Sequence, residues 1–456
     1  MESTMEKYIE KERAIDVIAD VDVLVVGGGP SGIGAAVGAA RAGSRVMIVE
    51  NMGSFGGMWT NGLVTTLGGF NSWLRPYRRC VDGVMGEWLR MSATRAGAED
   101  NRSWVLSSDP EVLKFTADEI IQKYGIRPLL HTWVADVIKD GDCVRGVIVE
   151  NVDGRKAIKA AVVVDCTGNG DVMARAGAAY RIAEQLQPMT MPFFLAQVEP
   201  QGSVGYEEEL VIPMGPEAGY LGKEMMPYTT RRRDMAVDNE VLDRAYERGE
   251  LPFFGGPWFG GLRVNYPWVN TTRVYGSAVD AAELTSAEME GRRDAHAIVD
   301  FYRRNLPGFE KCWIMSSAAT IGIRETRRLV GEYTLTGEDI VENRRFPDSI
   351  ALGVWPIDVH PQKGENGAHD MFVPLPYQIP YRCLIPESVD GLLVAGRCIS
   401  TDREAMGTIR VGATCGAIGH AAGIAAAMSV QKGCAPRKLD ARDVQIELIH
   451  QNAITE

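Results

Sequence analysis

One segment near the beginning of the chain restricts the possible folds more than any other, because a β-rich run leads directly into a glycine-rich turn and then a helix. Residues 21–26 (VDVLVV) predict a buried parallel strand, and the turn GGGPSG follows at 27–32. Residues 33–42, rich in alanine and glycine, predict a helix, and residues 45–50 (RVMIVE) predict a second strand. Such a unit is typical of a doubly wound α/β domain that binds a dinucleotide.

The glycines of this turn stand in the pattern G-x-G-x-x-G, and each has a separate physical role. Gly27 permits the tight turn, Gly29 lets a pyrophosphate approach the backbone, and Gly32 lets the helix pack closely on the strand. Pro30 and Ser31 stand at the start of the helix, where unpaired N–H groups and the positive end of the helix dipole attract phosphate. The alternative is a glycine-rich turn that binds nothing.

The residues after the second strand indicate which dinucleotide binds. Glu50 can accept hydrogen bonds from both hydroxyls of an adenosine ribose, whereas an arginine at this position would favour NADP. FAD proteins of the glutathione-reductase type carry a glycine pair shortly after this acid, here Gly56 and Gly57, and NAD dehydrogenases lack it. The segment therefore predicts FAD. The neighbouring residues expected at the cofactor are Asn51, Met58, Trp59 and Thr60, although Trp59 could equally belong to the core.

Five segments make the chain resemble a known family. They are VDVLVVGGGPSGIGAA at 21–36, VVDCTGNGD at 163–171, IGIRETRRLVGEY at 321–333, DGLLVAGRCIS at 390–400 and IRVGATCGAIGHAAG at 409–423. On these segments the chain resembles the FAD-dependent oxidoreductase family, which is related to HdrA-type and succinate dehydrogenase-like flavoproteins. The resemblance implies FAD, a glutathione-reductase-like fold and redox chemistry, and it implies no particular substrate.

The resemblance also indicates which later residues meet the cofactor. Residues 165–171 are similar to the segment that passes the adenosine half of FAD in this fold. Residues 409–416 lead into a predicted helix at 417–429, whose N-terminus would point at the N1/C2 carbonyl edge of the flavin. Arg410 would add positive charge there and help to stabilise reduced flavin. The residues assigned to the cofactor in the later segments are Thr167, Gly168, Asp171, Gly396, Arg397, Gly412, Ala413, Thr414 and Cys415.

The chain is expected to divide into three segments. Residues 1–180 form the first part of the FAD-binding domain, 181–380 an inserted α+β substrate domain, and 381–456 the return to the FAD-binding domain. The middle segment is rich in proline and aromatic residues, and it contains a predicted helix at 286–305. The first segment is expected to contain a helix at 111–125, a strand at 161–164 and a β-meander that covers one sheet face, with runs at 132–139, 143–151 and 155–159.

Candidates for the chemistry lie in the middle segment. In WPIDVHP the residues Asp358 and His360 would share one face of a strand-like run, so that Asp358 could orient His360 as a base. His369 is the second choice for this base, and the alternative for His360 is a surface or interdomain histidine. His420 stands in an apolar helix and is expected to be a core histidine.

A cluster of arginines at 324–328 (RETRR) allows two interpretations. Arg324 and Arg328 would share a face, and one or both could clamp a carboxylate of the substrate. The alternative, which the spacing favours, is an ion-pair network with Glu325 and Glu332.

Charge and cysteine usage limit the partners. Lys and Arg number 48 against 60 Asp and Glu, and the net charge of −12 argues against nucleic acid. The eight cysteines form no C-x-x-C pair, which predicts reduced thiols, no metal site and a cytoplasmic protein. The apolar stretch at 411–430 contains a histidine and predicts a buried helix instead of a membrane span. A homo-oligomer is compatible with the sequence.

These observations predict an enzyme: an FAD-dependent dehydrogenase or oxidase that takes a hydride from a small organic substrate onto flavin N5 and passes electrons to an external acceptor. One alternative is a reductase or monooxygenase fed by an external electron donor. Another is a flavin subunit of an electron-transfer complex, against which the lack of cysteine clusters speaks.

Overall fold

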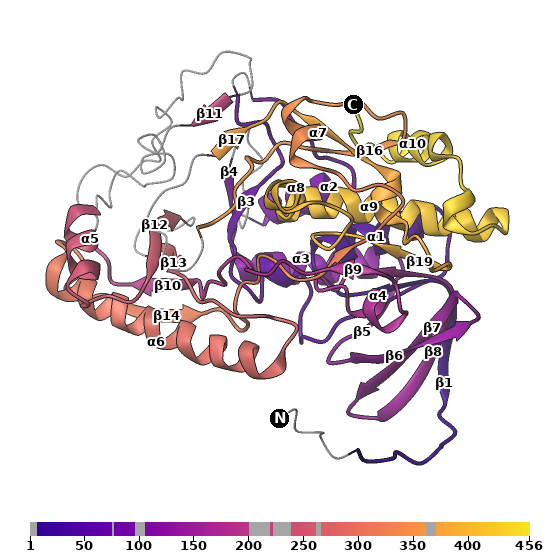
Figure 1. The fold of residues 1–456 in the computed structure, drawn as a ribbon, viewed down its shortest axis with the longest axis horizontal. Helices are drawn as coiled ribbons and strands as arrows, with labels where there is room; N and C mark the ends of the chain where they lie inside the picture. Colours follow the sequence, from indigo (N-terminus) through magenta and orange to yellow (C-terminus); the bar gives the residue numbers. More distant parts are fainter. Residues whose placement is uncertain are drawn as a thin grey trace.

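The computed structural model describes residues 7–74, 77–95, 105–199, 219–221, 239–260, 266–361 and 371–456. In this part of the chain a seven-stranded sheet runs in the order β5-β2-β1-β8-β7-β6, and β19 also pairs with β8 (Figure 1). Its strands are β1 (Val17–Val26), β2 (Val46–Val49), β5 (Arg127–Leu129), β6 (Trp133–Asp140), β7 (Cys143–Asn151), β8 (Gly154–Asp165) and β19 (Leu392–Val394). The pairings β5-β2, β2-β1, β1-β8 and β8-β19 are all parallel, which confirms the predicted α/β class.

Both faces of this sheet are covered. Along β1 the side chains of Val23 and Val25 enter the core that contains α1 (Pro30–Arg41) and α9 (Gly412–Lys432), whereas Leu24 and Val26 enter a second core on the other face. Because successive side chains of a strand point to opposite faces, a strand buried on both sides reads as a continuous apolar run. That is the pattern of residues 21–26.

Strand β8 corrects one expectation. The runs predicted at 155–159 and 161–164 form one strand, because no turn-forming residue separates them. Its first part pairs antiparallel with β7, and its last part pairs parallel with β1 and β19. The meander β6-β7-β8 is therefore hydrogen-bonded to the parallel sheet through β8, yet Val144 and Val147 of β7 share a core with Leu24 of β1, so the meander covers one sheet face as expected.

Helices α1 and α9 touch backbone to backbone. A Cβ atom on Gly34 would overlap the carbonyl oxygen of Gly416, and one on Gly423 would overlap that of Ala35. α9 begins at Gly412, five residues before the predicted start at 417; Gly416 reads as a helix breaker but lies inside the helix. By length and composition α9 could cross a membrane, and 83% of its apolar window is buried inside the structure.

The remaining helices around this core include α2 (Val84–Thr94), α3 (Pro110–Lys123) and α10 (Ala441–His450). The side chain of Asp109 caps α3 by accepting a hydrogen bond of 2.9 Å from the backbone N–H of Glu111. The helix predicted at 111–125 is present, and it begins one residue earlier, at Pro110. Shorter elements are η1 (Gly57–Trp59), β3 (Thr66–Gly68), β4 (Val105–Ser107), α4 (Asp171–Arg175), α8 (Arg403–Ile409) and η4 (Pro436–Lys438).

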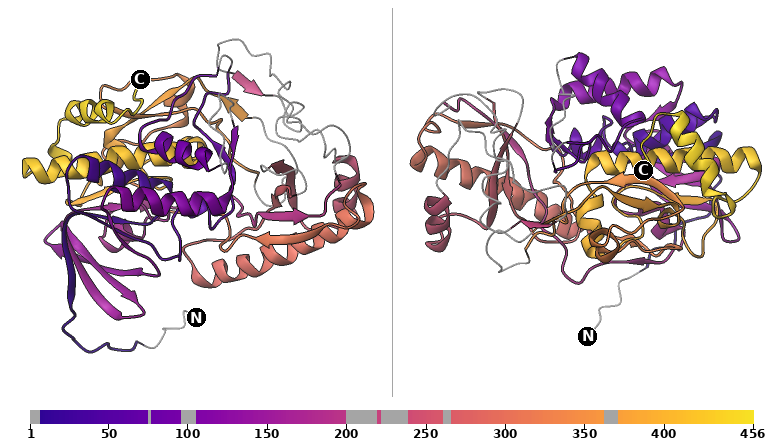
Figure 2. Two further views of the ribbon diagram at one scale, coloured as in Figure 1. Left: turned by 180° about the vertical axis from the view of Figure 1, so that it is seen from behind. Right: turned by 90° about the horizontal axis from the view of Figure 1, so that it is seen from above.

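A second part of the fold lies beside the seven-stranded sheet and its helices (Figure 2). It is built on a four-stranded antiparallel sheet in the order β12-β13-β10-β14. The strands are β10 (Phe193–Ala196), β12 (Phe254–Gly260), β13 (Trp268–Thr272) and β14 (Trp313–Ser317), and α5 (Asn239–Glu247) and α6 (Ala281–Asn305) accompany them. α6 begins at Ala281, earlier than the predicted 286, because Asp280 caps it at the backbone N–H of Glu283.

The segment from 329 to 385 packs differently from the rest of the predicted substrate domain. Its buried residues, such as Leu335, Ile350 and Tyr377, belong to the core around α9. The division of the chain at 181 and 380 stays a prediction. The elements here and at the edges are β9 (Tyr180–Arg181), β11 (Gly219–Leu221), β15 (Arg328–Leu329), α7 (Gly337–Val341), β16 (Ser349–Gly353), β17 (Met371–Val373), β18 (Tyr377–Pro380) and η3 (Tyr381–Leu384).

Candidate active site

The first group of predicted residues gathers where β1, β2, β8 and β19 end. Gly27 has a φ of +101°, and a Cβ there would overlap the carbonyl oxygen of Cys166, so only glycine fits. A Cβ on Gly32 would overlap the carbonyl of Gly27, which explains the close contact of helix and strand. Gly29 is the N-cap of α1, and no side chain of the described residues caps this helix. Its first N–H groups can therefore receive a phosphate.

Glu50 lies beside this turn with 6% of its surface exposed. One carboxylate oxygen accepts a hydrogen bond of 2.5 Å from the backbone N–H of Gly28, and the other accepts one of 2.8 Å from that of Met52. Each oxygen keeps a second lone pair, which suits the two hydroxyls of a ribose. Burial raises the pKa of Glu50, and the backbone N–H groups oppose that shift.

The loop with the glycine pair folds back onto Gly29. A Cβ on Gly57 would lie 2.8 Å from the Cα of Gly29, so the two backbones meet directly. Thr60 fixes the loop by donating from Oγ1 to the carbonyl of Phe55 at 2.7 Å. Asn51 is exposed, and Met58 lies against Gly62.

Trp59 belongs to the core. It is 3% exposed, and its ring centroid lies 5.2 Å from that of Trp88 and 6.0 Å from that of Phe70. A Cβ on Gly412 would overlap its indole, so Trp59 supports the start of α9 from behind. Of the two interpretations of Trp59, the structure therefore agrees with that of a core residue.

The turn after β8 depends on Asp165, which the sequence analysis did not single out. Its buried carboxylate accepts hydrogen bonds from the backbone N–H and Oγ1 of Thr167 and from the N–H groups of Val172 and Met173, at 2.7–3.0 Å. The Thr167 hydroxyl also accepts from the N–H of Asp171 at 3.0 Å, so this side chain serves the turn itself. An aspartate two residues before the first threonine or glycine of such a turn was the available signal.

The guanidinium of Arg397 covers this turn. Its carbon lies 3.2 Å from the place where a Cβ on Gly168 would stand, and one of its nitrogens donates to Oδ1 of Asn169. The Nε atom is buried and makes no hydrogen bond to the described part of the chain. Asp171 points elsewhere, since it pairs with Arg327 at 3.0 Å.

The start of α9 also presents unsatisfied donors. No described side chain caps this helix at Val411, and Oγ1 of Thr414 in the first turn is buried without a hydrogen-bond partner in the described residues. Cys415 donates from Sγ to the carbonyl of Ile409 at 3.4 Å, and burial raises its pKa to about 12. Orphaned donors at a helix start beside a dinucleotide fold fit a bound flavin nucleotide.

A second group of predicted residues lies next to this helix start. Arg410 directly precedes Val411, and its Nη2 atom lies 3.0 Å from Oδ2 of Asp358. Nε2 of His360 lies 3.7 Å from the same oxygen. Residues 355–361 form no strand, and only an isolated bridge from Ile357 to Phe372 is present, so the expected strand-like run was wrong. The predicted proximity of Asp358 and His360 is nevertheless present.

Arg324 belongs to the same group of residues, because two isolated β-bridges bring distant segments of the chain together. Thr190 bridges to Gly322, and Met189 bridges to Val274. As a result, the hydroxyl of Thr190 accepts hydrogen bonds from Nη1 of Arg324 at 2.7 Å and from Nη1 of Arg273 at 3.1 Å. Sequence reasoning missed Arg273 and Thr190, and no local pattern marks either residue.

Arg324 and Arg328 do not share a site, contrary to the expectation. Arg328 lies 3.9 Å from Glu325 in an ion pair, whereas Glu332 pairs with Arg437 at 3.0 Å. The prediction of an ion pair is therefore correct for Arg328 and wrong for Arg324. Residues 323–327 form neither a helix nor a strand, so the spacing of four positions gives the two arginines no common face.

The histidines fall into distinct environments. Burial together with Arg324, Arg273 and Arg410 holds the pKa of His360 well below its ordinary value, although Asp358 opposes the shift. His420 is a core histidine as predicted: Nε2 lies 2.8 Å from Oε1 of Gln451, and burial lowers its pKa to about 4. His369 lies outside the described residues.

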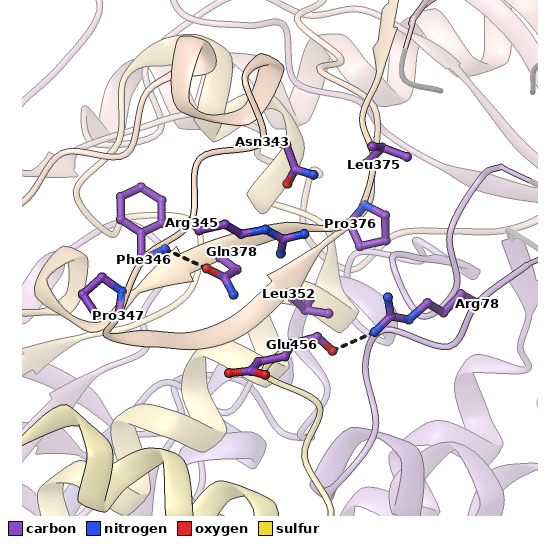
Figure 3. A pocket seen from close by; sticks show the side chains of 10 residues that line it. All are labelled: Arg78, Asn343, Arg345, Phe346, Pro347, Leu352, Leu375, Pro376, Gln378 and Glu456. Carbon is purple, nitrogen blue, oxygen red and sulfur yellow. Dashed lines mark hydrogen bonds between the residues drawn. The ribbon is translucent and has the colours of Figure 1, made fainter. Parts of the chain in front are cut away.

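A separate surface pocket of about 790 Å³ lies near β16 and β18 (Figure 3). Its lining contains none of the predicted site residues: Arg78, Asn343, Arg345, Phe346, Pro347, Leu352, Leu375, Pro376, Gln378 and Glu456. Within the described ranges no group of three His, Cys, Asp or Glu side chains could hold a metal ion, and all eight cysteines are free.

Comparison with known proteins agrees with this geometry. The profile of the family described as FAD dependent oxidoreductase matches residues 22–448. A thiamine thiazole synthase of Methanococcus vannielii is 31% identical over 176 residues, which is 35% of this chain and 59% of that protein. One of Methanococcus maripaludis is 29% identical over 164 residues, which is 34% and 58%. The chain thus spans less than two thirds of the length of these curated relatives.

Solved structures give weaker likenesses. A geranylgeranyl bacteriochlorophyll reductase-like protein of Thermoplasma acidophilum has a TM-score of 0.47 and 12% identity, covering 96% of this chain and 84% of that one. The p-nitrophenol 4-monooxygenase of Pseudomonas putida has a TM-score of 0.45 and 12% identity, covering 97% and 87%. The family match spans nearly the whole chain and coincides with the glycine-rich cradle, Glu50 and the start of α9. The chain belongs to the FAD-dependent oxidoreductase family, and it is an enzyme whose cofactor is FAD.

Proposed function

We propose that this enzyme is a dehydrogenase or oxidase that removes a hydride from carbon and a proton from a heteroatom of a small organic substrate, with His360 as the base. FAD, when bound, supplies the acceptor of the hydride. The observation that carries the proposal is the position of His360, whose ring lies beside the Asp358–Arg410 ion pair at the start of α9. Electrons then leave to an external acceptor such as oxygen, a quinone or a protein carrier.

The protonation state of His360 suits a base. Burial and three nearby arginines favour the neutral ring, so its nitrogen can accept a proton at neutral pH. Asp358 can orient the ring and stabilise the positive charge that develops when the proton arrives. In the sequence, Gln187 stands far from His360, yet its Oε1 accepts a hydrogen bond of 3.1 Å from the backbone N–H of His360 and fixes this loop.

The start of α9 contributes electrostatically. Its first-turn N–H groups and the adjacent Arg410 place positive potential at this end of the site. A positive potential favours the arrival of the negative charge that accompanies a hydride. We also propose that the body around the four-stranded sheet supplies the substrate side of the site, since Arg273 follows β13 directly.

The test is anaerobic reduction of the bound FAD. The purified holoenzyme is mixed with small alcohols, amines and hydroxy acids, and loss of the visible FAD absorption is followed. At least one donor is expected to bleach it, and His360→Asn is expected to slow that bleaching about 10²- to 10⁴-fold. The control is His296→Asn, an exposed histidine on α6 that should leave the rate unchanged.

Two results would contradict the proposal. One is bleaching at equal rates in the wild type and His360→Asn. The other is that no donor reduces FAD while electrons from an external donor drive reduction of an activated C=C bond or hydroxylation, which would support the reductase or monooxygenase alternative.

A further inference from the structure

Among the described residues, the group around His360 contains more positive than negative charge. Arg410 lowers the pKa of both Arg273 and Arg324, and Asp358 is the described carboxylate that raises the pKa of both. Arginine stays protonated in proteins. With His360 neutral, the group therefore carries three positive charges against one negative charge, an excess of two.

This charge is buried. Arg273 is 6% exposed and Arg324 8%, and burial is the largest cause that lowers the pKa of each. Uncompensated charge away from water is costly, and native structures neutralise it with a partner ion or a ligand. Asp358 pairs with Arg410 at 3.0 Å and also raises the pKa of Arg273 and Arg324, but its single negative charge balances only one of the three guanidinium groups.

Part of the hydrogen-bonding capacity of the cluster has no acceptor in the described residues. The hydrogen bonds that Arg324 and Arg273 make there use only Nη1 of each, and the acceptors are Thr190 Oγ1, Asn270 Oδ1 and backbone carbonyls. The amide nitrogen of Gln187, a residue 1% exposed, has no hydrogen-bond partner in the described part of the chain, and Nε of Arg410 has none either. Buried donors of this kind require an acceptor.

We propose that Arg273, Arg324 and Arg410 form an anion subsite that holds a carboxylate of the substrate beside His360. A carboxylate is planar and accepts two parallel N–H bonds from one guanidinium, which suits arginines with so little exposed surface. Its charge compensates the excess described above. The assignment of this anion as part of the substrate rests on the proposed function, whereas its binding does not.

The same geometry explains a glycine in β12. A Cβ on Gly255 would lie 2.6–2.8 Å from three atoms of the Arg273 guanidinium, so the strand backbone fixes that side chain from one side. Gly255→Ala is therefore expected to displace Arg273 without removing any charge. It should weaken anion binding several-fold.

The test measures equilibrium binding, separately from turnover. Malonate, benzoate, malonamide, benzamide and inorganic phosphate are titrated into the holoenzyme, and the visible FAD spectrum and the heat of binding are recorded. Each carboxylate is expected to bind saturably and at least tenfold more tightly than its neutral amide. Arg324→Gln should weaken this binding at least tenfold, and Arg324→Lys, which keeps the charge and loses the fork, should weaken it less.

The control is Arg328→Gln. Arg328 is also 8% exposed and stands four positions away in the same segment, but its ion pair is with Glu325 and not with Asp358, so carboxylate binding should be unchanged. Melting temperatures show whether each variant folds, and the wild-type comparison of acids with amides needs no variant.

Several results would overturn the proposal: equal binding of acids and amides, no binding of either, tighter binding of phosphate than of malonate or benzoate, or loss of FAD from folded Arg324→Gln. If carboxylates bind as expected and no carboxylate donor bleaches FAD, the anion subsite stands and the proposed hydride transfer fails.

Discussion

Nη2 of Arg410 lies 3.0 Å from Oδ2 of Asp358, and this ion pair joins two segments 52 residues apart in the chain. Arg410 ends α8 immediately before α9, whereas Asp358 stands in the loop that carries His360. The start of α9, the candidate base and the buried arginines are thereby held in one place. The chemistry proposed for the enzyme depends on this connection.

The first prediction concerns the pH dependence of turnover. Because burial, Arg324, Arg273 and Arg410 hold the pKa of His360 well below 6.5 and Asp358 only partly opposes them, the ring is neutral throughout the range from pH 6 to 8. We expect kcat/KM, which reports the ionisations of the free enzyme, to stay level as the pH falls from 8 to 6. An ordinary histidine base would lose activity below about pH 6.5.

Arg324→Gln provides the control for that profile. It removes a cation that lowers the pKa of His360, so the loss of kcat/KM on the acid side should move to higher pH. A purely structural effect of this substitution would lower kcat/KM equally at every pH, and that result would contradict the assignment of the base.

Thr414→Val separates a structural role from a cofactor role. The Thr414 hydroxyl is buried without a hydrogen-bond partner in the described residues, and such a group costs about 1–3 kcal/mol. Valine removes this cost, so the apoprotein should melt at a higher temperature. If the hydroxyl serves FAD, the same variant should bind FAD several-fold more weakly. A more stable apoprotein with unchanged FAD affinity would contradict the role.

Gly34→Ala tests the contact between α1 and α9. The added Cβ would overlap the carbonyl of Gly416, so the helices must separate, and we expect a loss of about 1–3 kcal/mol or more in stability. Gly125→Ala is the comparison, because nothing lies within 4 Å of its Cβ position and only the positive φ is disfavoured. A melting temperature of Gly34→Ala above that of Gly125→Ala would contradict the packing.

His420 predicts a pH dependence of stability. Its pKa is about 4 in the folded protein against 6.5 for an ordinary histidine, so between these values the unfolded chain binds a proton that the folded protein does not. Stability should therefore fall as the pH drops from about 6.5 to about 4, by roughly 3 kcal/mol at most. His420→Gln should show a smaller fall in melting temperature over this range than the wild type.

Cys415 is expected to be inert although it stands in the first turns of α9. Burial raises its pKa to about 12, so the thiolate is scarce at neutral pH. Iodoacetamide should leave Cys415 unmodified in the native protein and modify it after denaturation, as peptide mass analysis would show. FAD should likewise remain in the supernatant after acid precipitation; flavin bound to the pellet would show a covalent link and contradict this view.

Local sequence patterns were sufficient to predict the residues of the cofactor cradle. The turn at 27–32, Glu50 and the glycine pair follow directly from short-range requirements of strand, turn and helix, and the structure brings them together. The spacing of Asp358 and His360 was enough to place them together, even though the backbone there is not a strand. The start of α9 was misplaced because Gly416 breaks helices in isolation, whereas here it lies against Met85.

The substrate side was only partly predictable, for a physical reason. Thr190 and Arg324, the outermost of the three residues, stand 134 positions apart, with Arg273 between them in the chain. Antiparallel bridges between distant segments bring them together. Arg324 was a candidate because it lies in a conspicuous run of arginines, yet its neighbour Arg328 turned out to belong to another ion pair. Long-range pairing of this kind leaves no local mark in the sequence.

The most direct test is anaerobic mixing of the holoenzyme with a donor that carries a carboxylate beside its reacting C–H bond, in ordinary form and deuterated at that carbon. The account predicts loss of the visible FAD absorption, slower with the deuterated donor and strongly slowed in His360→Asn. FAD that stays oxidised with every such donor, or bleaching at the same rate in the wild type and His360→Asn, would contradict it.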